Sequence, residues 1–168
     1  MEPALVQGGA AVSDPSRDLL KLAVVERHRG TGNVGVAFAR GFGLKRGAIA
    51  SSVAHDSHNI VVLGADDDSM ETAVRRTAAI GGGVVVTDGA EVLAEVALPV
   101  AGLMSNAPIG EVDGAERKAN AAALSLGTTM DHPFMTLAFL ALPVIPELKL
   151  TDKGLVDVAK FDFVDVVA

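Results

Sequence analysis

The sequence has no cysteine, no tryptophan and no tyrosine, and each absence excludes a kind of site. Without cysteine the chain can form neither disulfides nor thiolate metal sites, which is compatible with a reducing cytosol, and we expect a cytoplasmic protein. Phenylalanine is the only aromatic residue besides histidine, and there are only six. The core must therefore be built from small side chains, and binding by aromatic stacking is not expected.

Positive charge is also scarce, because 14 Lys and Arg residues stand against 21 Asp and Glu residues, for a net charge of −7. The basic residues are scattered and form no stripe, so nucleic acid is not expected as a partner. The longest apolar run, residues 134–145, contains Thr136 and Pro143 and is shorter than the ~20 residues that a membrane-spanning helix needs. The first residues also lack the features of a signal peptide, so no membrane contact is expected.

The length and composition predict one globular domain. With 168 residues, 49% apolar and 21% charged, the chain can bury a single hydrophobic core. Residues 1–16 are rich in Gly, Ala and Pro without a clear period, which predicts a leader or the stump of an interdomain linker. The domain proper is then expected over residues 17–168.

The hydrophobic pattern predicts mostly closely spaced strands with short, glycine-containing connections, a spacing that favours antiparallel pairing. The dipeptide Asp88-Gly89 predicts a hairpin with a type I′ turn. The predicted strands cover residues 19–27, 34–42, 48–54, 59–64, 84–87, 91–98 and 161–167.

Two segments have helical periodicity instead. From Asp66, apolar or buried-type residues recur at three- and four-residue spacing, behind three aspartates and before Gly81, which predicts a capped amphipathic helix. A second helix is predicted over residues 108–126, ended by Gly127. The fold class expected is α+β: a single domain with a largely antiparallel or mixed β-sheet and two main flanking helices.

Residues 30–35 match the G-x-G-x-x-G pattern of dinucleotide-binding loops. Such a loop must open a long helix that holds the pyrophosphate, whereas the residues that follow alternate like a strand and are interrupted by Gly41 and Gly43. The pattern therefore predicts a tight strand connection rather than a nucleotide site. Residues 81–83 are likewise a helix terminator and no P-loop.

The polar run with the most chemical potential contains His55, Asp56, His58 and Asn59 between two apolar segments. In an extended strand the two histidines would face opposite sides, so they could share a ligand only if Asp56 and Ser57 form a turn. Imidazole and carboxylate ligands suit Zn, Fe or Mn, which makes His55, Asp56 and His58 candidate metal ligands.

Two other residues could join this run, and a second interpretation stays open. Glu26 or His28 could complete a ligand set if their strand lies alongside, and both are candidate substrate or interface contacts. Alternatively, Asp56 and Asn59 cap the local backbone while the histidines form hydrogen bonds in a domain interface. His132, before Pro133, is expected in a loop, and residues 134–145 are expected in the core or in a covered interface.

Four segments of the chain resemble the C-terminal domain of bacterial adenine deaminase, of the amidohydrolase superfamily, over about nine tenths of its length. They are RDLLKLAVVERHRGTGNVG from Arg17, GFGLKRGAIASSVAHDSHNIVVLG from Gly41, LPVAGLMS from Leu98 and DHPFMTLAFLALPVIPELKLTDKGLVDV from Asp131. The resemblance implies a hydrolase acting on a C–N bond of a cyclic amidine, which converts adenine to hypoxanthine and ammonia in purine salvage and adenine catabolism.

In that family the catalytic barrel implies a His-x-His pair and a divalent metal, Mn or Fe, whose hydroxide attacks the base. The four histidines of this chain include no such pair, and a barrel needs roughly 200 residues. The resemblance therefore implies a chain that supports a separate amidohydrolase catalytic domain, in cis or in trans, within a homo-oligomer. Adenine would be the substrate of the whole enzyme, and this chain alone is expected to be inactive.

Two alternatives from other functional classes remain open. The chain could be a free-standing, non-catalytic binding or assembly module. It could also be a small metal-dependent hydrolase that uses the loop at residues 55–59. The first alternative predicts stability without a catalytic partner, and the second predicts bound metal at His55, Asp56 and His58.

Overall fold

The computed structural model describes residues 5–166. The elements follow the chain as β1 (Leu5–Gln7), β2 (Ala10–Val12), a 3₁₀ turn (Pro15–Arg17), β3 (Leu20–Val25), β4 (Val34–Ala39), β5 (Ala48–Ser51), β6 (Ile60–Gly64), α1 (Asp67–Ala79), β7 (Gly83–Asp88), β8 (Glu91–Ala97), α2 (Ile109–Ser125), α3 (Pro133–Phe139), β9 (Leu148–Thr151), β10 (Gly154–Asp157) and β11 (Asp162–Val164).

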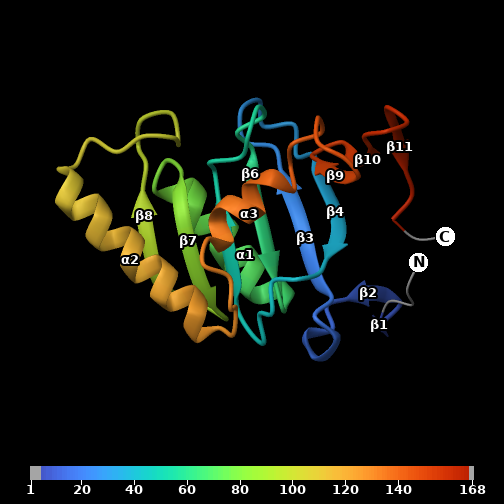
Figure 1. Ribbon diagram of the computed structural model, residues 1–168, viewed down its shortest axis with the longest axis horizontal. Helices are drawn as coiled ribbons and strands as arrows, with labels where there is room; N and C mark the ends of the chain where they lie inside the picture. The colour runs from blue at the N-terminus through green and yellow to red at the C-terminus, as the bar shows by residue number, and fades with distance from the viewer. Residues whose placement is uncertain (1–4, 167–168) are drawn as a thin grey trace.

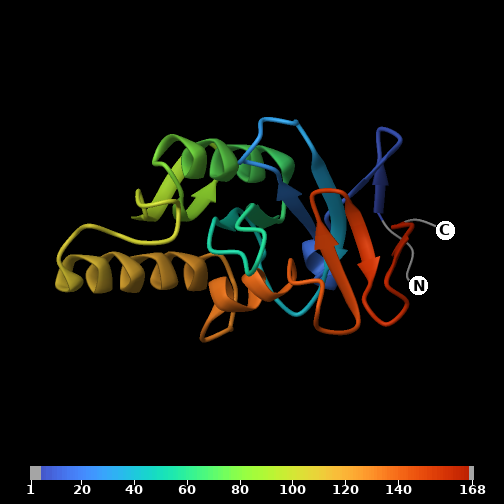
Figure 2. The same ribbon diagram turned by 90° about the horizontal axis from the view of Figure 1, so that it is seen from above.

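A six-stranded sheet in the order β4-β3-β6-β5-β7-β8 forms the centre of the molecule, and its neighbouring strands are all antiparallel. Helix α1 covers one face, and α2 and α3 cover the other (Figures 1 and 2). A small sheet, β11-β10-β9, lies against the β4 side, and β1 and β2 form a separate hairpin. The predicted α+β class is confirmed, with α3 as a third, shorter helix.

The sheet separates two hydrophobic clusters, as the alternation of side chains along a strand requires. In β6, Val61 and Leu63 belong to the cluster under α2 and α3, whereas Ile60 and Val62 belong to the cluster under α1. Central strand β5 is buried at all of its residues. Ala23, Ala48, Ala50 and Ala73 bring α1 close to the sheet, so the expectation of a core of small side chains holds on this face.

Helix α1 begins and ends as its sequence predicts. The Asp66 carboxylate accepts the backbone N–H of Ser69 at 2.7 Å, and Asp67 and Asp68 add negative charge to the first turn, where the helix dipole favours it. At the other end Gly81 adopts φ 79°, a left-handed conformation that stops the helix. Gly82 and Gly83 follow with close backbone approaches to Gly102 and Val96, so residues 81–83 are structural, as predicted.

The connection between β3 and β4 is the glycine-containing strand connection that was predicted. Gly30 and Gly32 have φ values of 63° and 75°, and β4 follows directly in place of a helix. Gly35 lies inside β4, where a Cβ atom would be only 1.9 Å from the carbonyl oxygen of Thr151. This close approach is how the small sheet packs against β4.

Several features differ from the sequence prediction. In the β7–β8 hairpin Asp88 pairs with Glu91, so the turn residues are Gly89 and Ala90, and only Gly89 has positive φ. The predicted type I′ turn is therefore wrong, because that turn requires positive φ at both central residues. Residues 161–167 were predicted as a strand, and β11 is shorter; Val167 lies outside the described residues.

The N-terminal segment also has more structure than its composition predicts. Residues 5–12 form the β1–β2 hairpin, and the Ser13 hydroxyl donates to the Gly64 carbonyl at 2.8 Å. Residues 1–4 lie outside the described part, and a role of residues 1–16 as a leader or linker stays a prediction. Within residues 5–166, none of the helices is both long and apolar enough to cross a membrane.

Candidate functional site

Two polar loops meet at one edge of the central sheet. Strand β3 pairs antiparallel with β6, with Val25 opposite Ile60, so the residues that follow β3 lie beside those that precede β6. This register brings Glu26, Arg27 and His28 next to the run at residues 55–59. The condition set by the sequence, that the two strands lie alongside each other, is met.

Residues 55–58 form the turn that a shared role of the two histidines requires. The N–H of Ser57 donates to the carbonyl of His55 at 2.9 Å, and the N–H of His58 donates to the carbonyl of Ala54 at 2.9 Å. Asp56 and His58 adopt left-handed φ values of 66° and 49°, a conformation that these residue types tolerate better than most. The chain therefore turns between His55 and His58, so the two side chains are not held on opposite sides as they would be in an extended strand.

Arg27 and His28 hold this turn from the neighbouring loop. Arg27 Nε donates to the His58 carbonyl at 2.5 Å, and its Nη2 donates to the Ala101 carbonyl at 2.8 Å. The Nε2 atom of His28 lies 2.8 Å from the Ser57 carbonyl. Partial burial lowers the pKa of Arg27 from its ordinary value. One guanidinium thus joins three loops, a role that the sequence analysis did not identify.

Glu26 shapes its own loop. Its carboxylate accepts the backbone N–H groups of His28 at 2.5 Å, Arg29 at 2.8 Å and Thr31 at 3.0 Å. These bonds, that from Thr31 most of all, lower the pKa of Glu26 to about 2. Through these bonds Glu26 fixes the loop that carries His28, and its own role as a substrate or interface contact stays a prediction.

His55, His58 and Asn59 retain unused polar atoms. The Nδ1 atoms of both histidines and the Oδ1 atom of Asn59 are buried without a hydrogen-bond partner in the described part of the chain. The His55 ring stacks on Phe139 with centroids 4.5 Å apart, and Asn59 Nδ2 donates to Asp152 at 3.1 Å. Buried groups of this kind cost about 1–3 kcal/mol each and call for a functional explanation or a bound partner.

The residues do not fit a complete metal centre. Two imidazole nitrogens without partners are suitable donors, but residues 5–166 contain no group of three or more His, Asp or Glu side chains that could hold an ion together. Asp56, the third candidate ligand, is exposed in the turn. The role of His55, Asp56 and His58 as candidate metal ligands stays a prediction.

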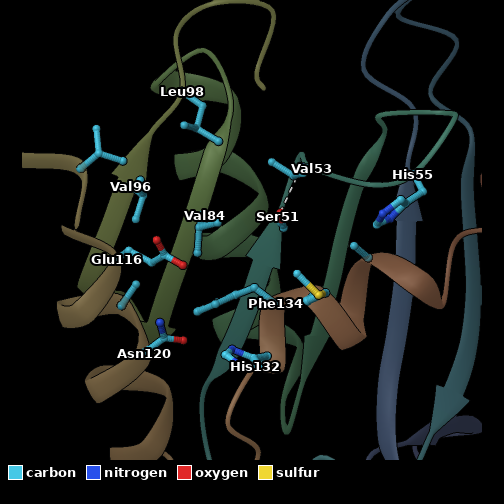
Figure 3. A pocket seen from close by; sticks show the side chains of 14 residues that line it. Ser51, Val53, His55, Val84, Val96, Leu98, Glu116, Asn120, His132 and Phe134 are labelled. Atoms are coloured by element: carbon cyan, nitrogen blue, oxygen red, sulfur yellow. Dashed lines mark hydrogen bonds between the residues drawn. The ribbon is translucent and has the colours of Figure 1, made fainter. Parts of the chain in front are cut away.

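A cavity of about 350 Å³ opens between the sheet, α2 and α3, and His55 lies in its wall (Figure 3). Its apolar lining includes Val84, Val96 and Phe134. The polar side chains that line it are Ser51, His55, Glu116, Asn120 and His132.

The sequence did not single out Glu116 and Asn120. Both lie in the predicted helix over residues 108–126 and are four positions apart, which places them on one helix face. This spacing was the signal that could have identified them. His132 lies in the connection before α3, as expected, where it is the N-cap residue of that helix, and it lines the same cavity.

The segment at residues 134–145 is partly core and partly exposed. Leu137, Ala138, Ala141 and Leu142 are buried. A second set of side chains from this region remains accessible, namely Met135, Phe139, Val144 and Ile145, and we call this set the α3 apolar face. The sequence expectation of core or covered interface is thus confirmed for the core part only.

Comparison with known proteins identifies the family of the chain. Residues 1–162 match the family model described as the adenine deaminase C-terminal domain. The chain is 55% identical over 162 residues to an adenine deaminase of Desulfatibacillum aliphaticivorans, and this match covers 96% of the chain and 28% of the relative.

Two further relatives show the same pattern. An adenine deaminase of Methanothrix thermoacetophila is 55% identical over 95% of the chain and 28% of the relative. One of Brucella melitensis biotype 1 is 56% identical over 90% of the chain and 26% of the relative. The chain spans little more than a quarter of the length of these curated relatives, and it belongs to the adenine deaminase C-terminal domain family.

Proposed function

We propose that this chain acts as the C-terminal module of a cytoplasmic adenine deaminase and supports a separate amidohydrolase catalytic domain. The whole enzyme would hydrolyse adenine to hypoxanthine and ammonia in purine salvage. The observation that carries the proposal is the family match over residues 1–162, combined with relatives of which this chain covers only 28%. The divalent metal, Mn or Fe, would belong to the catalytic domain.

The two polar loops at the edge of the sheet, residues 26–28 and 55–59, support a role beside the active site of the catalytic domain. Arg27 fixes the backbone of the histidine turn, and Glu26 fixes the loop that carries His28. The turn that carries the imidazoles of His55 and His58 is thereby held in place, with both Nδ1 atoms buried. Such preorganised polar groups suit contact with a substrate or with a neighbouring domain. We assign substrate or interface contacts to His28, His55, Asp56, His58 and Asn59 on this basis.

The α3 apolar face is the surface we assign to docking of the catalytic domain. Met135 and Val144 are 61% and 62% exposed, and Phe139 and Ile145 are also accessible. Most of the length of each relative lies outside the matched region, so a large partner domain accompanies this module in those proteins. Covering these side chains would remove apolar surface from water and would favour association. We also expect the whole enzyme to self-associate.

The experiment combines an activity assay with a binding assay. The chain alone, given adenine with Mn²⁺ or Fe²⁺, is expected to produce no hypoxanthine. Mixed with the catalytic domain of the Desulfatibacillum aliphaticivorans relative at micromolar concentration, it is expected to co-elute. Adenine turnover by the chain alone, abolished by a chelator, would overturn the proposal, and so would separate elution of the two proteins.

A matched pair of variants tests the docking surface. Met135→Lys places a charge on the α3 apolar face and is expected to weaken association by roughly tenfold or more, as for a residue central to an interface. Ile109→Lys introduces the same charge at an apolar position that is 84% exposed at the start of α2, and it is expected to leave association unchanged. Equal effects of the two variants would place the interface elsewhere.

A further inference from the structure

We propose that strand β4 is the interface through which two copies of this chain pair, edge to edge, into one continuous antiparallel sheet. The pairing gives a surface to the self-association that we expect of the whole enzyme, and it is connected to the proposed function by that expectation alone. It uses neither the polar loops at residues 26–28 and 55–59 nor the α3 apolar face. None of its evidence depends on adenine hydrolysis.

The outer edge of β4 has no strand beside it. β4 is the last strand of the central sheet and, in the described part of the chain, it pairs with β3 alone (Figure 1). The small sheet forms no ladder with β4 and instead packs on the face from which Gly35 approaches Thr151. A row of backbone N–H and C=O groups is therefore available to another strand.

The register with β3 identifies those backbone groups. In an antiparallel pair, opposite residues that exchange hydrogen bonds alternate with opposite residues that do not. The N–H of Glu26 donates to the carbonyl of Asn33 at 3.0 Å, directly beyond the last pair of the β3–β4 ladder. Counted from this bonded pair, the odd-numbered residues of β4 bond to β3. The backbone groups that point away from β3 therefore belong to Val34, Val36 and Phe38.

β4 lacks the features that keep an exposed edge strand from pairing. Charged side chains, proline and bulges are the usual protections. β4 has the sequence VGVAFA, without a charge or a proline, and its register with β3 is unbroken. The opposite edge strand, β8, carries Glu91 and Glu95 and has a register irregularity with β7. The contrast indicates that β4 is the edge available for pairing.

Apolar side chains on the α1 side of β4 add to this edge. Val34 and Val36 are 51% and 42% exposed, because α1 packs mainly on β5, β6, β7 and β8. Val36 lies opposite Ala23, which belongs to the hydrophobic cluster under α1, and Phe38 lies on the same face of β4. Pairing at this edge would therefore extend an existing cluster and remove apolar surface from water.

A second copy of the chain fits this edge because the exposed pattern is symmetric about Val36. Two β4 strands related by a two-fold axis at Val36 run antiparallel, with Val36 opposite its own copy and Val34 opposite Phe38 of the other copy. Every outward backbone group of these residues then has a partner, whereas a shift by two residues would leave groups at both ends unpaired. Valine opposite phenylalanine is a favourable cross-strand pair, and β4 has no charge to repel its copy.

Sedimentation of the full chain over a concentration series tests the pairing. We expect a dimer with a Kd below about 100 μM, since one strand edge is a small interface. Val36→Lys places like charges opposite each other on the axis and is expected to raise the Kd roughly tenfold or more. Leu124→Lys adds the same charge at a 53% exposed apolar position on α2 and is expected to leave the dimer unchanged.

A proline substitution tests the part played by the backbone. Val36→Pro removes an N–H that points away from β3, so the bonds within the chain remain while the ladder between copies is interrupted. The dimer is expected to be lost. The melting temperature, measured where both proteins are monomers, should stay near that of the parent chain. Val36→Thr keeps the N–H and the β-branched shape and should retain the dimer.

Cysteine cross-linking tests the register, because the chain has no cysteine of its own that could compete. Val36→Cys should form a disulfide with its own copy, since directly opposite residues lie within the Cα separation that a disulfide spans. Chains with Val34→Cys should cross-link to chains with Phe38→Cys in preference to themselves. Leu124→Cys is the control for random collision.

A monomer at about 500 μM would overturn the inference. So would a dimer that Val36→Lys and Val36→Pro leave intact, or cross-linking of Val36→Cys that does not exceed that of Leu124→Cys. A dimer dispersed by Met135→Lys in place of Val36→Lys would overturn it too, because self-association would then use the α3 apolar face. All of these measurements use the chain without adenine or a catalytic domain, so the proposed hydrolysis and domain docking stand or fall separately.

Discussion

The guanidinium of Arg27 donates to the backbone carbonyl of His58 at 2.5 Å, which links two loops that are 31 residues apart in the chain. A second bond from the same side chain reaches Ala101, so one cation holds the histidine turn against two neighbouring loops. A Cβ atom at Gly102 would lie within 2.7 Å of this guanidinium, which shows how closely the third loop is packed. The position of His55 and His58 thus depends on a residue that bonds to backbone carbonyls and to neither imidazole.

Replacing Arg27 should loosen the turn. Arg27→Ala removes two charge-assisted bonds to carbonyl groups and is expected to lower the free energy of unfolding by about 1–3 kcal/mol. Arg29→Ala, at an exposed position in the same loop, should change it by less than ~0.5 kcal/mol. Denaturant titration of both variants measures the difference, and hydrogen exchange should show faster opening at residues 55–58 in Arg27→Ala alone.

Glu26 should make stability depend on acid. Its folded pKa of about 2 lies below the ordinary value of 4.5, so between these values the unfolded chain binds more protons than the folded one. The stabilisation is therefore complete above pH 4.5 and is lost as the pH falls through 2. Melting temperatures measured from pH 6 downward should fall less steeply for Glu26→Gln than for the parent chain. A Glu111→Gln control whose slope decreases equally would show that the effect is not specific to the loop.

The two histidines of the turn should matter more for function than for stability. Neither Nδ1 atom makes a hydrogen bond in the described structure, so His58→Ala should shift the melting temperature by a few degrees at most. His55→Ala also loses the stacking on Phe139, worth about 0.5–1.5 kcal/mol. Both variants should impair adenine turnover once the catalytic domain is present. A large loss of stability in either variant, with no metal bound to the parent chain, would contradict a functional role for this turn.

Gly35 should be among the least replaceable glycines. A methyl group there would lie 1.9 Å from the Thr151 carbonyl, so Gly35→Ala must displace β9 from β4 and is expected to cost about 1–3 kcal/mol or more. Gly114, inside α2, is a matched control because a methyl group added there would meet no atom within 4 Å outside its own helix backbone and chain neighbours. Gly114→Ala should instead stabilise the helix by roughly 0.5–1 kcal/mol. Opposite signs in chemical denaturation are the expected result.

Local patterns in the sequence predict the elements that are stabilised locally. The strands around Leu22 and Val62 are apolar and β-branched, and α1 has its Asp66 cap and Gly81 stop within its own segment. Helix α3 was missed because it has only seven residues and no side-chain cap, too little for a helical period to show. The hairpin of β9 and β10 had an available turn signal in Asp152 and Gly154.

The candidate site was predictable only in part, for a related reason. The sequence identified His55, His58 and the need for a turn between them, because those residues are only three positions apart in the chain. The contacts from Arg27 to Ala101 and from Asn59 to Asp152 join segments 74 and 93 residues apart, and no local pattern encodes them. The cavity is likewise assembled from the sheet and two helices, so its polar lining is recognisable only in three dimensions.

The place of β5 in the sheet has a consequence for how the domain unfolds. Strands β4, β3 and β6 lie on one side of it and β7 and β8 on the other, so β5 is the only strand bonded to both groups. Each group contains a hairpin of neighbouring strands, β3–β4 in one and β7–β8 in the other, which can form early. To join the two groups, β5 must pair with β6, which precedes α1 in the chain, and with β7, which follows it. Disruption of β5 would leave the β7–β8 hairpin apart from the three strands β4, β3 and β6, and an isolated hairpin is at best marginally stable, so both sides of the sheet are expected to melt in one cooperative transition.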